Sequence, residues 1–274
     1  MTLFQSILLG IVQGITEFLP ISSSGHLVLV PHLLGWELDP QAVFVFDVLV
    51  QVATLVAVFA YFWSDLVTIG RAFLAGLWQR APFDDPESRL GWLILLATIP
   101  AGLAGLFLKD ALESALNSPL VTALFLFVTA GLLVIAEQLG KREHKAEQLS
   151  WLDALIIGVF QILALFPGVS RSGATITGGM LRRLDRPSAA RFSFLMSIPI
   201  MLAAGLLATL DLLQIPNLSA VLPTFLAGFL AAAVTGYLSI RWLLGYLSHR
   251  SLYGFALYCA GFGLLNVIVL LVRG

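Results

Sequence analysis

The sequence predicts an all-α polytopic membrane protein with six transmembrane helices, two re-entrant helical hairpins and an inverted-topology internal repeat. Of the 274 residues, 59% are hydrophobic and only 11% are charged, whereas soluble domains carry about 25% charged residues. Long apolar stretches recur along the chain, and one polar motif occurs twice inside apolar sequence. We therefore expect a single membrane domain over residues 1–274.

Six apolar stretches are long enough for a bilayer span, which needs about 20 residues. They cover residues 42–63, 90–108, 119–138, 189–210, 219–240 and 252–272. The main polar connections are expected at 64–89 and 139–150. No basic segment precedes the apolar N-terminal run, so we expect no cleaved signal peptide.

The polar motif runs from Gly10 to His26 in its first copy and from Gly158 to Ala174 in its second. At one constant spacing the identical pairs are Gly10/Gly158, Gln13/Gln161, Phe18/Phe166, Ser22/Ser170, Ser24/Ser172 and Gly25/Gly173. Each copy is a short apolar segment broken by proline or glycine before a Ser-x-Ser-Gly turn. Interrupted apolar segments at matching positions in two halves indicate a site near the middle of the membrane.

The two motif segments, 3–21 and 152–169, are expected to be re-entrant hairpins. Irregular backbone inside a membrane must be covered by protein or line a water-filled cavity. Two ordinary kinked helices are the alternative. An odd number of predicted spans separates the copies, so the halves, at approximately 1–140 and 150–274, should be inverted and their turns should meet inside the membrane.

The distribution of lysine and arginine between the loops predicts the orientation. Basic residues gather in 64–89, 139–150 and 241–251, whereas the first loop on the other side has Lys109 and 211–218 has none. The basic side should face the cytoplasm, and both termini should face outward. The net charge of −1 gives no indication of nucleic-acid binding.

Glu17 is the most unusual residue of the first copy, because a carboxylate within the membrane is costly and normally marks a site or an ion path. Gln13 lies on the same helix face, four residues earlier. The backbone N–H groups of the following turn, Ser22–Gly25, can bind an anion. His26 is a candidate proton acceptor or nucleophile. An interfacial glutamate and a helix-capping histidine are the alternatives.

The second copy places Arg171 at the tip of its turn. A guanidinium group can hold phosphate oxygens with a forked pair of hydrogen bonds. An ion pair with Glu17 that only neutralises a buried charge is the alternative. Asp47 and Gln51 form another polar pair, which either lines the same cavity or bonds neighbouring helices.

The two turns together suit a phosphate and a cation. The guanidinium and hydroxyl groups suit phosphate, whereas the Glu17 carboxylate suits a hard divalent ion that bridges to phosphate oxygens. We therefore expect Mg²⁺ or Ca²⁺ at Glu17, assisted by Gln13. The sequence has no Cys/His zinc spacing, Walker loop or Rossmann turn.

These motifs closely resemble those of the undecaprenyl-diphosphate phosphatases, also called the bacitracin-resistance family. The segments that carry the resemblance are Gln13-x-x-x-Glu17, Pro20-Ile-Ser22-Ser23-Ser24-Gly25-His26 and Pro167-Gly-x-Ser170-Arg171-Ser172-Gly-x-Thr175. The resemblance covers essentially the whole chain. Many members of that family have glutamate at the position of Gln13, so metal binding should depend more on Glu17.

The resemblance implies a bacterial inner-membrane enzyme that removes the terminal phosphate of undecaprenyl (C55) diphosphate and so recycles the lipid carrier of cell-wall glycans. It implies dependence on Mg²⁺ or Ca²⁺ and a site that opens to the outer, periplasmic side. The expected partners are the polyprenyl diphosphate and membrane lipids, without nucleic acid. A homodimer is left open.

Specific roles follow for the motif residues. The terminal phosphate should be held by Ser23, Ser170, Arg171, Ser172 and Thr175. The catalytic group should consist of Glu17, His26, Arg171, Ser22 and Ser24. We favour His26 as general base, acting on Ser22, Ser24 or a water, and direct attack by His26 is the alternative.

Three other functions compete with this interpretation. A polyprenyl-phosphate flippase or transporter would use the same anion site without cleavage, and inverted repeats are typical of transporters. The acid-phosphatase type of membrane enzyme is excluded, because its Lys-x6-Arg-Pro element is absent and no His and Asp follow Arg171 at the expected spacing. A purely structural protein would leave Glu17 and Arg171 unexplained.

Overall fold

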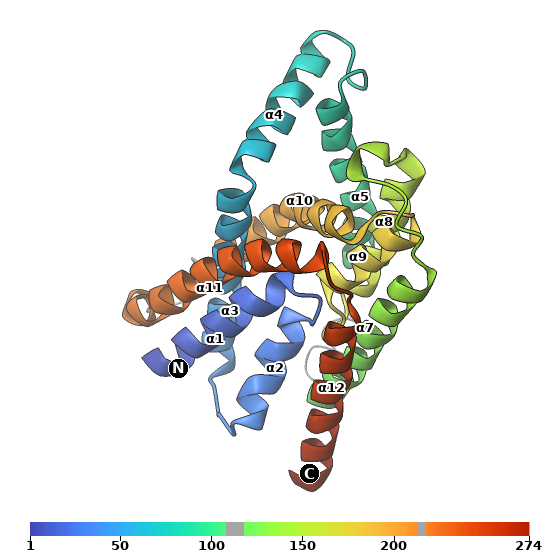
Figure 1. Cartoon of the computed structure of the whole chain (residues 1–274). Helices are drawn as coiled ribbons and strands as arrows, with labels where there is room; N and C mark the ends of the chain where they lie inside the picture. Colours follow the sequence, from blue (N-terminus) through green and yellow to red (C-terminus); the bar gives the residue numbers. More distant parts are fainter. Residues whose placement is uncertain (108–117, 213–217, 274) are drawn as a thin grey trace.

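The computed structural model describes residues 1–107, 118–212 and 218–273 (Figure 1). In this part of the chain the regular structure is helical, apart from one isolated bridge between His144 and Leu184. Lys109 and residues 213–217, which belong to the two outer loops expected from the sequence, lie outside the described residues.

The described elements are α1 Leu3–Phe18, α2 Ser23–Leu33, α3 Pro40–Tyr61, α4 Trp63–Trp78, α5 Pro86–Phe107, α7 Pro119–Leu139, a 3₁₀ turn at Ala146–Gln148, α8 Trp151–Leu163, α9 Arg171–Leu181, α10 Arg186–Leu212, α11 Leu218–Leu247 and α12 Tyr253–Arg273. Five are long and apolar enough to cross a bilayer: α3, α5, α7, α12 and the Leu222–Leu247 part of α11. The sixth predicted span, 189–210, lies in α10, which is not among these five. Arg186 and Arg191 lie at the beginning of α10.

The sequence predicts a polar connection at 64–89, and the first half of this connection forms a helix, α4, which is not among the candidate spans. Ile69 is buried there, and the ring of Phe73 lies 4.8 Å from that of Trp92 in α5. Figure 1 shows α4 and α5 as two long helices that meet at the top of the view. Charged residues interspersed with apolar ones lower the hydropathy of this segment, although its apolar side chains recur at helical spacing.

Each copy of the repeated motif folds as two short helices joined by a turn, α1–α2 and α8–α9. Ser22 and Ser170 are the N-caps of α2 and α9, and their Oγ atoms accept from the N–H groups of Gly25 and Gly173 at 3.2 and 3.1 Å. A serine in this position satisfies a donor that the first turn of a helix leaves free. The repeated Ser-x-Ser-Gly sequence is therefore a repeated helix start.

Glycine at the same position of each copy permits a close contact between helices. Gly10 of α1 lies against the backbone of Gly228 in α11, and Gly158 of α8 lies against the backbone of Ala97 in α5. A Cβ atom at either position would collide with a carbonyl oxygen. Small residues allow such close approach between apolar helices.

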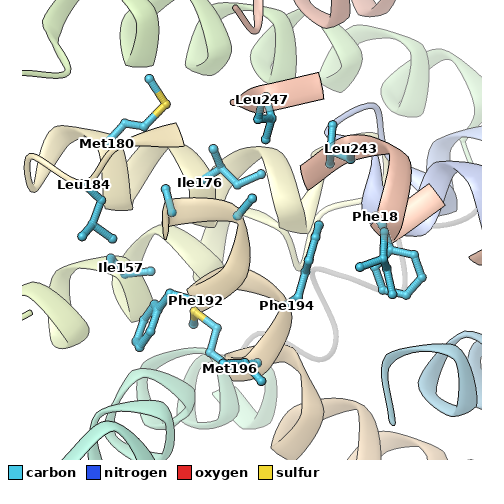
Figure 2. Close-up of a cluster of buried hydrophobic side chains, with 14 of the residues drawn as sticks. Phe18, Ile157, Ile176, Met180, Leu184, Phe192, Phe194, Met196, Leu243 and Leu247 are labelled. Atoms are coloured by element: carbon cyan, nitrogen blue, oxygen red, sulfur yellow. The ribbon is translucent and has the colours of Figure 1, made fainter. Parts of the chain in front are cut away.

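A buried apolar cluster brings together side chains of α1, α8, α9, α10 and α11 (Figure 2). Phe18, the residue after Glu17, packs edge-on against Phe194 of α10 with ring centroids 5.4 Å apart. Ile176 of α9 belongs to the same cluster. Because α1 and α9 share this core, the end of α1 and the start of α9 are held at a fixed separation.

Glu137, near the C-terminus of α7, connects several of the basic segments. Its carboxylate accepts from Arg142, from Arg186 at the start of α10, and from the backbone N–H of Leu252 before α12. The connections 139–150 and 241–251, which the sequence places on the same side, therefore meet at one end of the molecule.

Candidate active site

An ion pair between Glu17 and Arg171 forms the centre of the candidate site. Glu17 lies at the end of α1 and Arg171 is the first residue of α9. Arg171 Nη2 lies 2.8 Å from Glu17 Oε1, and the two side chains are 19% and 9% exposed. The pairing that the sequence left as an alternative is therefore present, and it joins the two repeated turns.

The second carboxylate oxygen of Glu17 accepts from both neighbours that the sequence placed near it. Gln13 Nε2 lies 2.9 Å and Ser23 Oγ 2.6 Å from Glu17 Oε2. Glu17 therefore already holds three donors. The Oε1 atom of Gln13 is buried and has no hydrogen-bond partner within the described residues.

A cavity of about 150 Å³ lies beside this ion pair. It is lined by Glu17, Arg171, Ser22, Ser23, Ser24, Ser170, Gln51, Ala164 and Val169. One water takes about 30 Å³ in the liquid, so the space is sufficient for a phosphate group. The Nη1 donor of Arg171 is buried and has no partner in the described ranges. Of the expected Asp47–Gln51 pair, only Gln51 is among the lining residues.

The two turns share the Ser-x-Ser-Gly pattern but differ in backbone conformation. Ser22 has φ 74°, in the left-handed region that non-glycine residues seldom adopt, whereas Ser170 has φ −71°. The Ser22 carbonyl accepts from the backbone N–H of His26 at 3.2 Å and contacts His26 Nδ1 at 2.7 Å. Such backbone persists only where its surroundings hold it, and it is concentrated at functional sites.

The second turn is held by α7 through a residue that the sequence did not single out. Thr129 Oγ1 donates to the carbonyl of Gly168 at 2.9 Å and accepts from the N–H of Ser170 at 2.9 Å. Thr129 is fully buried. A hydroxyl side chain in the apolar middle of α7 was the available signal.

Two hydroxyls expected to hold phosphate instead bond to protein. Ser172 Oγ donates to the carbonyl of Leu19 at 3.1 Å and so ties the second turn to the first. Thr175 Oγ1 donates to the Arg171 carbonyl at 2.8 Å and lies 2.6 Å from Ser193 Oγ of α10. Neither residue lines the cavity. The other expected phosphate ligands, Ser23, Ser170 and Arg171, do line it.

His26 does not line this cavity either. It lines a separate apolar groove of about 500 Å³ between α1–α2 and α11–α12. Its Nδ1 faces the Ser22 carbonyl, which can only accept, so Nδ1 carries a proton; in the neutral ring Nε2 then accepts from the Tyr258 hydroxyl, 2.8 Å away. The ring also stacks on Phe262 with centroids 4.5 Å apart. Both ring nitrogens are thus engaged within the protein.

Gln161 is the functional candidate that the sequence analysis did not assign. It is 2% exposed, and neither of its amide atoms has a partner among the described residues. It lines a second cavity of about 250 Å³ that shares Glu17, Arg171 and Gln51 with the first. Its identity with Gln13 in the repeat was the signal that could have identified it.

The donor set fits a divalent ion under one condition. Within the described residues, no group of three or more His, Cys, Asp or Glu side chains could hold a metal. Glu17 is the carboxylate of both cavities, and three donors occupy it. The free amide oxygens of Gln13 and Gln161 are hard ligands of the type that Mg²⁺ and Ca²⁺ accept. A divalent ion therefore fits if a donor moves away from Glu17.

The fold and the site together define a multi-pass, all-helical membrane protein with a polar cavity formed by two repeated turns. The family model described as "Bacitracin resistance protein BacA" matches residues 6–265. The chain therefore belongs to this family, and the resemblance read from its motifs is confirmed.

Relatives named undecaprenyl-diphosphatase match the chain over nearly its whole length. The Thermomicrobium roseum protein is 44% identical over 98% of both chains. The Methanosphaera stadtmanae protein is 42% identical over 98% of this chain and 99% of its own. The Chlorobium phaeobacteroides protein is 45% identical over 98% of both. The names of these relatives describe an enzyme and give no support to the flippase alternative.

Proposed function

We propose that this protein is a membrane phosphatase that hydrolyses undecaprenyl diphosphate to the monophosphate and orthophosphate. One observation carries the proposal: a guanidinium group and the hydroxyls of Ser22, Ser23, Ser24 and Ser170 surround a phosphate-sized space beside Glu17. The similarity to undecaprenyl-diphosphatases over 98% of the chain supports the lipid substrate.

Arg171 is assigned to the terminal phosphate. Its Nη2 is held by Glu17, and its buried Nη1 is free to donate to a phosphate oxygen. Phosphoryl transfer depends mainly on positioning and on stabilising the charge of the transferred group. A guanidinium fixed by a carboxylate is already oriented for that task.

The geometry favours Ser23 as the nucleophile if a serine attacks. Its hydroxyl already donates to Glu17 at 2.6 Å. In that step Ser23 Oγ bonds to the terminal phosphorus, the bond to the bridging oxygen breaks, and the proton passes to Glu17. The lipid monophosphate departs with the bridging oxygen, and water then hydrolyses the phosphoserine. Direct attack by water, with Glu17 as proton acceptor, is the alternative.

His26 is assigned to the support of the first turn rather than to proton transfer. Its Nδ1–H donates to the carbonyl of the strained Ser22. A role as general base, which the sequence favoured, would require the Tyr258 hydroxyl to leave Nε2. That role stays a prediction.

Glu17, with the amide oxygens of Gln13 and Gln161, would hold Mg²⁺ or Ca²⁺. When bound, such an ion supplies positive charge that offsets the diphosphate oxygens. Arg171 is the only basic side chain that lines either cavity in the described part of the chain. One guanidinium leaves a diphosphate largely uncompensated, and this favours the metal.

We also propose that α1–α2 and α8–α9 are re-entrant hairpins in two inverted halves, 1–140 and 150–274, with α10 as the sixth span. The hairpin helices have 16, 11, 13 and 11 residues, fewer than the roughly 20 that a span requires. The matching roles of Gly10 and Gly158 support the repeat. The bacterial inner membrane and an outward opening stay predictions from the basic loops and the resemblance. The homodimer, which the sequence left open, has no support from the comparisons.

Orthophosphate release from C55 diphosphate by purified protein in detergent tests the proposal. We expect release by the wild type and none by Arg171→Lys. A wild type that releases no orthophosphate, yet moves polyprenyl phosphate across vesicles, would establish the flippase instead.

A further inference from the structure

We propose that the cavity lined by Gln161 binds the inner phosphate group of the substrate, the one that stays on the lipid. We further propose that the isoprenoid chain leaves the site from this cavity, between α3, α8 and α10. This inference rests on the proposed function, and it assigns the second phosphate of the diphosphate to a place in the site.

The first step is that the two cavities adjoin. Both are lined by Glu17, Gln51, Ala164 and Arg171. The two phosphates of a diphosphate share one bridging oxygen, so a ligand with one phosphate in each cavity would place that oxygen beside Arg171. The hydroxyl-lined cavity takes the terminal phosphate, which leaves the other cavity for the inner one.

The second step is the state of Gln161. The side chain is 2% exposed, and both amide atoms lack partners among the described residues. Burying an amide without hydrogen bonds is unfavourable, so buried polar groups are normally paired. A phosphate oxygen can accept from Nε2, as it can from Arg171 Nη1, which is also buried and free. The amide adds a donor without adding the negative charge that a carboxylate would bring.

The third step is the change of chemistry along the cavity. Besides its polar residues, the cavity is lined by Ala164, Leu165, Ile200 and Met201. Gln51 of α3 is exposed and marks an open side of the cavity. A wall that combines a guanidinium and amides with apolar side chains matches a diphosphate joined to a hydrocarbon.

The larger apolar groove is not continuous with the polar cavities. The groove lined by His26 and Tyr258 has no lining residue in common with either polar cavity. The segment that holds Leu19 and Ile21 contributes to the groove, whereas Glu17 and Ser22 on either side contribute to the polar cavity. A chain in the groove would therefore have to cross the first turn to reach the phosphates.

Binding of two inorganic ligands tests the phosphate assignment without turnover. Gln161→Met keeps the length of the side chain and removes the amide, and Gln138→Met on an exposed part of α7 is the matched control. At fixed, saturating Mg²⁺ we expect Gln161→Met to raise the Kd of pyrophosphate about tenfold, the scale of one lost hydrogen bond to a charged group. The Kd of orthophosphate should stay within about twofold, because orthophosphate needs only the hydroxyl-lined cavity.

Several outcomes would overturn the phosphate assignment. These are unchanged pyrophosphate binding, or an equal loss for both anions. A shift confined to the Mg²⁺ concentration needed for binding would leave Gln161 only its role as a cation ligand and would refute its contact with the inner phosphate. If Gln161→Met does not fold, Gln161→Glu provides the test, because its carboxylate should weaken pyrophosphate more than orthophosphate. Absence of phosphatase activity in the wild type would refute the proposed function but leave these binding results intact.

Bulky substitutions test the route of the chain. Met201→Trp narrows the proposed exit, and Ile15→Trp adds the same bulk to the larger groove. We expect Met201→Trp to raise the KM for C55 diphosphate about tenfold, with pyrophosphate binding unchanged, and Ile15→Trp to change that KM less than about twofold. The reverse pattern would place the chain in the larger groove.

Discussion

Glu17 and Arg171, at the ends of two helices far apart in the sequence, form an ion pair with 2.8 Å between Oε1 and Nη2. Ser172 adds a second link, because its hydroxyl donates to the carbonyl of Leu19 in the first turn. The two turns are therefore fixed against each other, and the cavity between them exists only because both are present.

Loss of either partner of this ion pair should abolish turnover. We expect Glu17→Gln and Arg171→Lys each to lower kcat/KM at least about 100-fold, since each removes a preorganised charge contact that phosphoryl transfer requires. Lysine retains the charge but not the forked geometry. Phosphate release measures the effect, with Arg182→Lys at the far end of α9 as control. Full activity of Glu17→Gln with an ordinary metal response would eliminate the metal role of Glu17.

The same two residues should show coupled effects on stability. Removal of one partner of a buried pair leaves the other uncompensated and typically costs about 3–5 kcal/mol. Because the Arg171 side chain is 19% exposed, we expect the loss of unfolding free energy in Glu17→Gln to lie at or below the lower end of that range. Thermal unfolding in detergent should show the double variant Glu17→Gln/Arg171→Gln closer to the wild type than Glu17→Gln alone. Additive losses would show that the pair is not coupled.

Substitutions of His26 should separate support of the turn from proton transfer. Asparagine can place a donor near the position of Nδ1 and still bond the Ser22 carbonyl, whereas alanine cannot. We expect His26→Asn to retain activity within about tenfold and His26→Ala to lose about 100-fold, the range of one positioning contact. Equal, complete loss in both variants would restore His26 as the general base.

Chelation should remove activity, and Mg²⁺ or Ca²⁺ should restore it. Gln13 lies 2.9 Å from Glu17, so Gln13→Glu places a second carboxylate beside the first and should lower the Mg²⁺ concentration for half-maximal activity. Added carboxylate ligands raise the affinity of oxygen-ligand sites. A wild type fully active after exhaustive chelation would contradict this prediction.

The basic connections should face the cytoplasm. Cys259 is the single cysteine of the chain and is buried, so Lys145→Cys provides a clean labelling site. We expect no reaction with an impermeant reagent in intact cells and full reaction after permeabilisation. Labelling from outside would reverse the orientation and place the candidate site on the other face.

The repeat and its turns were predictable because each signal was local. The Ser-x-Ser-Gly sequence marks a helix start by its capping chemistry, and Gln13 and Glu17 share a face by spacing alone. The contact of Glu17 with the turn of Arg171 was also predictable, because charged groups inside a membrane need partners.

The roles of His26, Thr175 and Gln161 were not predictable, because they depend on which neighbouring helix each side chain meets. His26 follows the serines in sequence and contacts Ser22, but its Nε2 atom and its ring face meet Tyr258 and Phe262 of α12. Thr175 lies one turn into α9 and bonds Ser193 of α10. Gln161 shares its repeat position with Gln13, but its role depends on the cavity around it.

A single-turnover reaction with C55 diphosphate labelled at the terminal phosphorus tests the central claim most directly. The account predicts that the label passes to orthophosphate and that the lipid remains as an unlabelled monophosphate. If Ser23 is the nucleophile, rapid quenching should trap the label transiently on Ser23, and Ser23→Ala should abolish the trapped species. Label on His26, Ser22 or Ser24 would refute the roles assigned to these residues. If the label stays on the lipid even in a large molar excess of enzyme, the claim that the two joined turns form a phosphatase site is contradicted.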